Sequence, residues 1–165
     1  MGVLQEAQGA YTDAAKSYTE AETVWKAQEG PEGLGVARAS NSLGVVEHLQ
    51  GHEDAAEARY RAALAIYVAK EPDGDELPKV RNNLGNAMAA AGRLEEAAAW
   101  LRSAIERRPD YAEAWLNLSA VLKQQDRLEE GVECCRQAIR LAPAMGEAFS
   151  NLGALLAEGG EWEAA

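Results

Sequence analysis

Residues 112–143 read AEAWLNLSAVLKQQDRLEEGVECCRQAIRLAP, and this stretch is the clearest copy of a pattern that recurs along the chain. Related segments begin at Ser40, Asn82 and Ser150, and an incomplete copy occupies the first residues of the chain. Each full copy has the length of two helices joined by a turn. Self-similarity at this period therefore predicts a stack of helical hairpins.

One residue marks the turn of each copy, and the markers are Gly9, Gly51, Gly92, Asp126 and Gly160. Successive markers lie 42, 41, 34 and 34 residues apart, so the first two full copies carry an insertion. The inserted residues lie between Trp25 and Val36 and between Ala69 and Pro78, and both stretches contain Pro and Gly. We therefore expect a longer second helix in both places, ending in a turn.

Small residues recur where the two helices of each hairpin should cross. They follow a periodic leucine, and the four positions are Gly44, Gly85, Ser119 and Gly153. Antiparallel helices approach to about 8–10 Å only when small side chains meet at the crossing. A bulky side chain there would cost roughly 1–3 kcal/mol. The second helix carries a small residue on either side of a larger one, which is Tyr18, Tyr60, Leu101 or Cys135.

This pattern resembles the tetratricopeptide repeat (TPR). The copy at 112–143 matches the family at Trp115, Leu118, Gly131, Ala138 and Pro143, with Ser119 in place of the usual glycine and Leu122 in place of tyrosine. The resemblance covers essentially the whole chain and implies an all-α fold, a right-handed α-α superhelix (solenoid) of antiparallel helix pairs. The copies of 41 or 42 residues resemble those of kinesin light chains. The 34-residue copies resemble those in front of O-GlcNAc transferases and similar bacterial glycosyltransferases.

We expect a single domain over residues 1–165. It divides into a partial repeat 1–36, full repeats 37–77, 78–111 and 112–145, and a partial repeat 146–165. Met1-Gly2 falls in the middle of a first helix of the pattern, and Ala165 falls where the last second helix begins. Because a solenoid needs polar capping repeats at its ends, we expect an excerpt of a longer protein. A free-standing short open reading frame is the alternative.

The resemblance implies that the first helix of each pair lines a concave face. Counted from the start of each copy, the sixth position holds Ser42, Asn83, Asn117 and Asn151, the fifth holds Asn41 and Asn82, and the ninth holds Asn86. An amide side chain has two donors and an acceptor, so such a row can hold the backbone of an extended peptide. In the glycosyltransferase subtype an asparagine row is the peptide-holding feature. Alternatively, these residues are merely tolerated at a solvent-facing position, or they bond to local backbone.

Three basic residues fall on the same expected concave face, namely Arg38, Lys79 and Lys123. Chaperone-binding members of the family hold a C-terminal carboxylate with a clamp of lysine and arginine at three fixed positions. Here those positions hold Asn41, Glu113 and Asn117, or Asn82, Glu147 and Asn151. The clamp is therefore absent from the sequence, and we expect a groove that runs from basic to acidic.

Composition argues against several classes of partner. The formal net charge of -11 disfavours nucleic acid, which requires a basic footprint, and it disfavours an anionic membrane surface as well. No run approaches the roughly 18 apolar residues of a membrane span, and the N-terminus lacks the regions of a signal peptide. We expect a cytoplasmic protein that binds a protein or peptide.

Two short motifs look like metal sites, but each has a simpler interpretation. His48 and His52 are four residues apart, yet Gly51 between them is the expected turn residue, so they should not share a helical face. Asp73-Gly74-Asp75 resembles part of a calcium loop but lacks the remaining ligands. We expect no metal and no cofactor.

The remaining candidates for chemistry favour packing. Cys134 and Cys135 are neighbours that diverge by about 100 degrees on a helix, and no histidine lies near them in the repeat pattern. They predict neither a zinc site nor a catalytic thiol. Trp115 and Phe149 occupy the family's aromatic core position, so we expect them to be packed. No catalytic residue is predicted in this chain.

The sequence thus favours a protein–protein interaction module that binds an extended peptide or partner segment on its concave face. One alternative is the substrate-recruiting arm of a larger enzyme, such as a bacterial O-GlcNAc-transferase-like glycosyltransferase, whose catalytic domain lies outside this chain. A further alternative is a structural scaffold that self-associates through its uncapped ends. Apolar residues expected to be exposed at the C-terminal end are Leu152, Leu155, Leu156 and Trp162.

Overall fold

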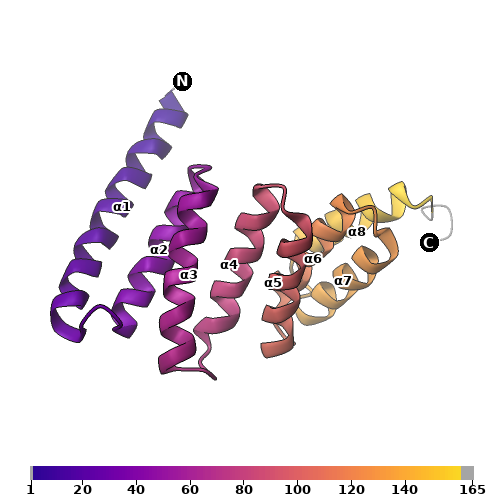
Figure 1. Ribbon diagram of the computed structural model, residues 1–165. Coiled ribbons are helices and arrows are strands. Elements are labelled where there is room, and N and C mark those ends of the chain that lie inside the picture. The colour runs from indigo at the N-terminus through magenta and orange to yellow at the C-terminus, as the bar shows by residue number, and fades with distance from the viewer. Residues whose placement is uncertain (1, 161–165) are drawn as a thin grey trace.

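The computed structural model describes the backbone of residues 2–160 and the side chains of residues 8–160. Every regular element in this range is an α-helix, which confirms the all-α prediction. The helices are α1 (Gly2–Glu29), α2 (Leu34–Leu49), α3 (Glu53–Lys70), α4 (Glu76–Ala90), α5 (Leu94–Arg107), α6 (Ala112–Gln124), α7 (Leu128–Leu141) and α8 (Gly146–Glu158). They follow one another in a row from the N-terminus to the C-terminus (Figure 1).

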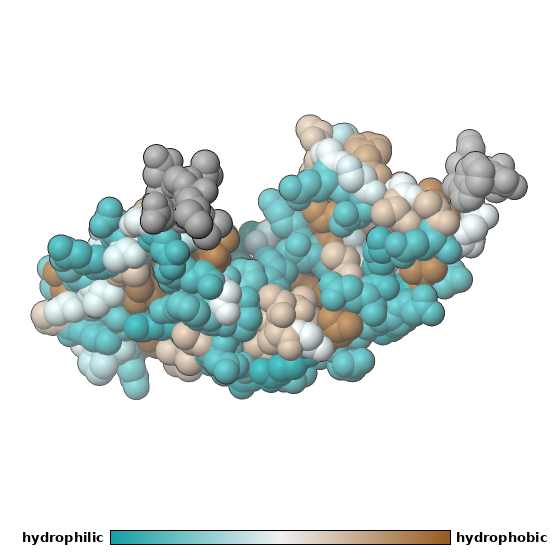
Figure 2. Space-filling view, turned by 90° about the horizontal axis from the view of Figure 1, so that it is seen from above, coloured by the Kyte–Doolittle hydropathy of each residue, from teal (hydrophilic) through white to brown (hydrophobic). Residues whose placement is uncertain are grey.

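Consecutive helices pack against each other along the whole row, and the most extensive contacts join α2 to α3, α4 to α5 and α6 to α7. This pairing is that of a TPR solenoid, as predicted. Helices α2, α4, α6 and α8 also approach one another from repeat to repeat, whereas α3, α5 and α7 do not. The first set therefore forms the shorter side of a curved molecule, which we call the inner wall. The space-filling view shows this curvature, with apolar patches set among mostly hydrophilic side chains (Figure 2).

The turns within the hairpins depend on residues with positive φ. Gly51, Gly92 and Gly160 have φ of 78°, 75° and 73°, and Asp126 has φ of 59° at the equivalent position. Glycine populates this left-handed region without a steric penalty, and aspartate tolerates it better than most residues. The periodic turn markers are confirmed at these four positions.

The predicted turn at Gly9 is wrong, because this residue lies inside the continuous helix α1. The described residues before Gly9 are too few to form a stable helix that packs back on the next one. Continuing the helix pairs the backbone groups, at a cost of about 1 kcal/mol for a glycine in its interior. The predicted insertions are confirmed, since α1 ends just before Gly30 and α3 has 18 residues against 14 in α5.

The small residues do lie where the helices of each pair cross. A Cβ atom on Gly44 would stand 2.6 Å from the ring of Tyr60, and one on Gly85 would stand 2.6 Å from Cγ of Leu101. Tyr60, Leu101 and Cys135 are all buried. Tyr18, predicted to be equivalent, is 38 % exposed, because no helix precedes α1 within the described residues to cover it.

Candidate binding face

The predicted binding residues come together on the inner wall. Asn41 lies on α2, Asn82, Asn83 and Asn86 on α4, Asn117 on α6 and Asn151 on α8. All are half-buried except Asn82, which is only 5 % exposed. The residues at the sixth position, Asn83, Asn117 and Asn151, are called the amide row below.

Two members of the amide row form hydrogen bonds with the preceding repeat. Nδ2 of Asn83 donates to Oδ1 of Asn41 over 3.1 Å, and Nδ2 of Asn117 donates to Oδ1 of Asn82 over 2.9 Å. In each case an amide at the sixth position of one copy meets an amide at the fifth position of the copy before it. These bonds connect neighbouring inner helices directly.

This pairing accounts for part of the helix-propensity cost of the asparagines. Each hydrogen bond contributes about 0.5–1.5 kcal/mol net, which offsets the roughly 0.5–0.7 kcal/mol that an asparagine costs in a helix. Local bonding to backbone, the alternative considered from the sequence, is not the observed arrangement for Asn83 and Asn117. The Asn-Asn doublet at 82–83 is the feature of the sequence that could have indicated this pairing. Asn83 bonds to α2 on one side of α4, and Asn82 bonds to α6 on the other.

Asn151 differs from the other two members of the amide row. The fifth position of the preceding copy holds Leu116, which has no hydrogen-bonding side chain and is buried. Asn151 instead lines a cavity of about 350 Å³ between α6 and α8, together with Lys123 and Glu158. Nζ of Lys123 lies 2.7 Å from Oε1 of Glu158, so an ion pair forms at this cavity.

The predicted basic residues are largely paired. Lys123 bonds to Glu158 as described, and Nζ of Lys79 lies 2.6 Å from Oε1 of Glu76 in the same helix. Arg38 is exposed on α2, whereas Glu113 and Glu147 are exposed on α6 and α8. The order of these exposed charges along the inner wall agrees with a groove that is more basic toward its N-terminal end.

The two histidines contact two different glutamates. Nδ1 of His48 lies 2.7 Å from Oε2 of Glu53, and Nδ1 of His52 lies 2.9 Å from Oε2 of Glu47. These contacts tie the ends of α2 and α3 together across the turn at Gly51. Among residues 8–160 no cluster of three or more metal-ligating side chains is present.

Both cysteines are buried and free. Burial raises the pKa of the Cys134 thiol to about 11 and also raises that of Cys135. The thiols are therefore neutral near pH 7 and behave as small apolar groups.

Three predictions about packing need correction or limits. Phe149 is 51 % exposed, because no described helix follows α8 to cover it, as α7 follows α6. Leu155 was expected to be exposed but is 1 % exposed, since Gly131 on α7 leaves room for its side chain. Trp162 lies outside the described residues. Trp115 is half-buried and its Nε1 donates to the carbonyl oxygen of Pro109 over 2.9 Å.

Comparison with family models supports the repeat assignment along the chain. Residues 1–69 and residues 112–145 match models described as tetratricopeptide repeat, and residues 85–126 match one described as TPR repeat. Together these matches cover more than half of the chain. No curated protein matches it. Among the described helices, none is both long and apolar enough to cross a bilayer.

Proposed function

Because the chain belongs to the tetratricopeptide repeat family, whose repeats form protein–protein interaction modules with extended concave surfaces, we propose that it binds an extended peptide segment along the inner wall. The observation that carries this proposal is the amide row. Three asparagines stand at the same position of α4, α6 and α8, at a spacing set by the repeat itself.

The cross-repeat bonds prepare two of these amides for binding. Each bond uses one N–H of Asn83 or Asn117 and holds the side chain in a fixed orientation. The bond leaves the second N–H and the carbonyl oxygen of the same amide for a ligand. Amides that are already ordered lose less conformational entropy on binding, which favours affinity. Backbone groups of an extended peptide are the matching donors and acceptors.

The test uses a peptide selected from a random display library against the whole chain. Asn151→Ala removes the one member of the amide row that has no asparagine partner in the preceding repeat. We expect it to weaken binding about two- to twelvefold, the loss of one hydrogen bond of about 0.5–1.5 kcal/mol, without lowering Tm. Gln28→Ala, which removes an exposed amide from α1 outside the inner wall, is the matched control. Equal affinities of Asn151→Ala and the parent chain would refute a binding role for this residue.

An enzyme-recruiting role is the second candidate. The 34-residue copies that carry Asn117 and Asn151 resemble those attached to glycosyltransferases, and the same inner wall would then present substrates to a catalytic domain. The sequence of the parent gene beyond Ala165 decides this point. A catalytic domain there would support the enzyme-recruiting role. Further repeats followed by a stop codon would exclude it.

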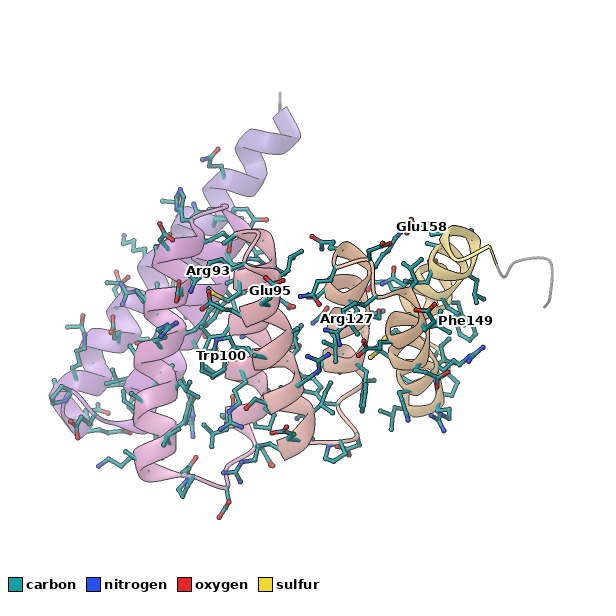
Figure 3. The ribbon with its side chains drawn as sticks, turned by 45° about the vertical axis from the view of Figure 1, so that its right-hand side comes forward. Arg93, Glu95, Trp100, Arg127, Phe149 and Glu158 are labelled. Atoms are coloured by element: carbon teal, nitrogen blue, oxygen red, sulfur yellow. The ribbon has the colours of Figure 1, made fainter. Side chains whose placement is uncertain are left out.

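Self-association is favoured by a different observation. Near the C-terminal end Phe149 and Leu141 are 51 % and 40 % exposed, and Leu152 and Leu156 are half-buried. Figure 3 shows Phe149 at the C-terminal end of the row of helices. Analytical ultracentrifugation of the parent and of Phe149→Lys tests this candidate. Association that the substitution abolishes would support it, and a monomer at all concentrations would exclude it.

A further inference from the structure

The outer face of the solenoid has one position that differs sharply from repeat to repeat. The eighth residue after each turn marker is Arg59 on α3, Trp100 on α5 and Cys134 on α7. Each of these side chains lies at the crevice between its own helix and the preceding outer helix. The three crevices therefore differ in the side chain that stands in them and in how far they are filled.

An ion pair fills the crevice between α1 and α3. Nη1 of Arg59 lies 3.2 Å from Oε2 of Glu22, which is 7 % exposed and also pairs with Lys26 at 2.8 Å. The next crevice, between α3 and α5, contains an aromatic ring. Trp100 is half-buried and packs against the main core, and Figure 3 shows it on the side of α5 that faces α3.

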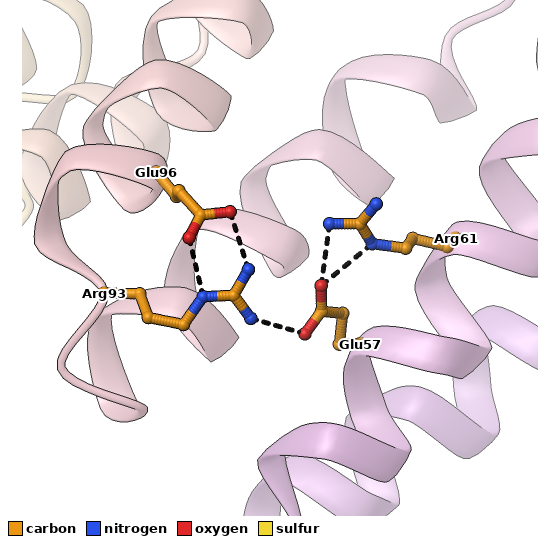
Figure 4. A network of polar contacts seen from close by, with 4 residues as sticks. All are labelled: Glu57, Arg61, Arg93 and Glu96. Carbon is orange, nitrogen blue, oxygen red and sulfur yellow. Dashed lines mark hydrogen bonds and ion pairs between the residues drawn. The ribbon is translucent and has the colours of Figure 1, made fainter.

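Polar contacts close the crevice between α3 and α5 as well. Nη1 of Arg93 on the turn before α5 lies 2.7 Å from Oε2 of Glu57 on α3, while its other nitrogens bind Glu96 (Figure 4). Hydrogen bonds to Glu96 and then to Glu57 raise the pKa of Arg93. The equivalent Arg127 bonds to Glu130 of its own hairpin, because Ala98 stands where α3 has Glu57.

The crevice between α5 and α7 remains open and forms a groove of about 510 Å³ over α6, which we call the outer groove. A short thiol stands here in place of an indole ring. The apolar floor consists of Ile105, Trp115, Leu118, Leu122 and Cys134. A volume of this size and an apolar lining are typical of binding pockets.

The rim of the outer groove is acidic. It carries Glu106, Glu129, Glu130 and Glu133 against a single arginine, Arg102. Nη2 of Arg102 lies 3.6 Å from Oε2 of Glu130, which also pairs with Arg127, and Oε1 of Glu133 lies 2.6 Å from Nη1 of Arg136. Among the described residues Glu106 and Glu129 form no ion pair, so these two carry the uncompensated charge of the rim. The net negative rim favours a partner with positive charge close to its apolar group.

We propose that the outer groove binds a segment of a partner protein in which one bulky apolar side chain is flanked by lysine or arginine. The apolar side chain enters the groove over Leu118 and Cys134, and the basic residues face Glu106 and Glu129. A buried anchor surrounded by contacts that exclude water is the usual arrangement of an interface hot spot. This site lies on the opposite side of the solenoid from the inner wall, so the chain can hold two segments at once.

The test begins with a random peptide display library selected on the parent chain and counter-selected on Cys134→Trp. This substitution fills the outer groove as Trp100 fills the neighbouring crevice. We expect the retained peptides to contain a bulky apolar residue next to lysine or arginine. We expect Cys134→Trp to weaken their binding by about tenfold or more in fluorescence anisotropy. Ala62→Trp, at an exposed position of α3, is the control that adds the same ring elsewhere.

A second variant keeps the test valid if Cys134→Trp fails to fold. Glu106→Gln combined with Glu129→Gln changes only exposed side chains, and we expect it to weaken binding by about threefold or more and to reduce its salt dependence. The proposal is overturned if no peptide survives counter-selection, if the surviving peptides lack basic residues, or if the glutamine variant binds them as well as the parent chain does.

Discussion

The inner wall and the outer face of this solenoid are built from the same repeats but behave differently. On the inner wall neighbouring helices approach closely, and similar side chains meet at similar heights, as in the amide pairs Asn41–Asn83 and Asn82–Asn117. On the outer face the helices stand apart, and each crevice is closed by different chemistry or left open. On the inner wall the contacts between repeats therefore follow the sequence period, whereas on the outer face they depend on individual residues.

The largest expected effect on the free energy of unfolding distinguishes the filled crevice at Trp100 from the open one at Cys134. Trp100→Ala removes a half-buried ring that packs on the core, and we expect a loss of about 2–3 kcal/mol, somewhat below the range for a fully buried tryptophan. Cys134→Ala deletes one small group beside an open groove and should cost about 1 kcal/mol. Urea denaturation of both variants measures the difference. Equal losses would mean that Trp100 does not close its crevice.

An intermediate effect distinguishes the crevice held by an ion pair. Burial alone would raise the pKa of Glu22, but Lys26 and Arg59 together outweigh it and bring the pKa below its ordinary value of 4.5. The unfolded chain then binds the proton more tightly, so this contribution to stability is present above pH 4.5 and is lost as the pH falls through the lowered pKa.

We therefore expect Glu22→Gln to lower the free energy of unfolding by about 1 kcal/mol near pH 7 and to flatten its decline in acid. Denaturant titrations from neutral to acidic pH compare the variant with the parent chain. Asp54→Asn, on an exposed residue of α3, is a matched removal of one carboxylate. A parallel decline for parent and Glu22→Gln would contradict the assignment.

A comparable effect is expected on the inner wall. Asn82 is 5 % exposed and accepts the hydrogen bond from Asn117, so Asn82→Ala should cost about 1 kcal/mol. Asn86→Ala, four residues later on the same helix, should be neutral or slightly stabilising because alanine is the better helix former. Thermal melting of both variants separates a structural amide from a tolerated one. Stabilisation by Asn82→Ala would show that the bond contributes nothing.

The smallest effect concerns two equivalent arginines. Arg93 links α5 to Glu57 on α3, whereas Arg127 bonds within its own hairpin. Both lie near the surface, where ion pairs contribute little and are screened by salt. We expect Arg93→Ala to lower Tm more than Arg127→Ala, with the difference shrinking at high salt. The opposite order would contradict the role given to Arg93.

The sequence predicted those packing contacts that depend on the spacing of residues within one repeat. Leu84 and Gly85 belong to the repeat pattern, and the structure places Gly85 against Leu101 as that pattern requires. The bond between Asn83 and Asn41 was not foreseen, because it depends on the relative height of two helices that are 42 residues apart in the chain. The exposure of a position also depends on its neighbours.

The errors at the ends of the chain have the same physical origin. A repeat position is buried only when helices pack on both sides of it, and no described helix follows α8, so Phe149 is exposed although Trp115 at the equivalent position is half-buried. Gly9 follows the turn pattern, but no stable preceding helix accompanies it and α1 continues through it. Sequence periodicity gives the position of a residue within its repeat, but it does not show which helices pack against that residue.

The most direct measurement of the proposed function is an NMR titration that follows the side-chain amide signals of Asn83, Asn117 and Asn151 while a peptide selected on the Cys134→Trp variant is added. With the outer groove filled in this way, the remaining binding should occur on the inner wall. We predict that these three signals shift together and saturate at one affinity. Saturable binding that leaves them unchanged and shifts only backbone signals of α3, α5 and α7 would contradict the inner wall as the peptide-binding face.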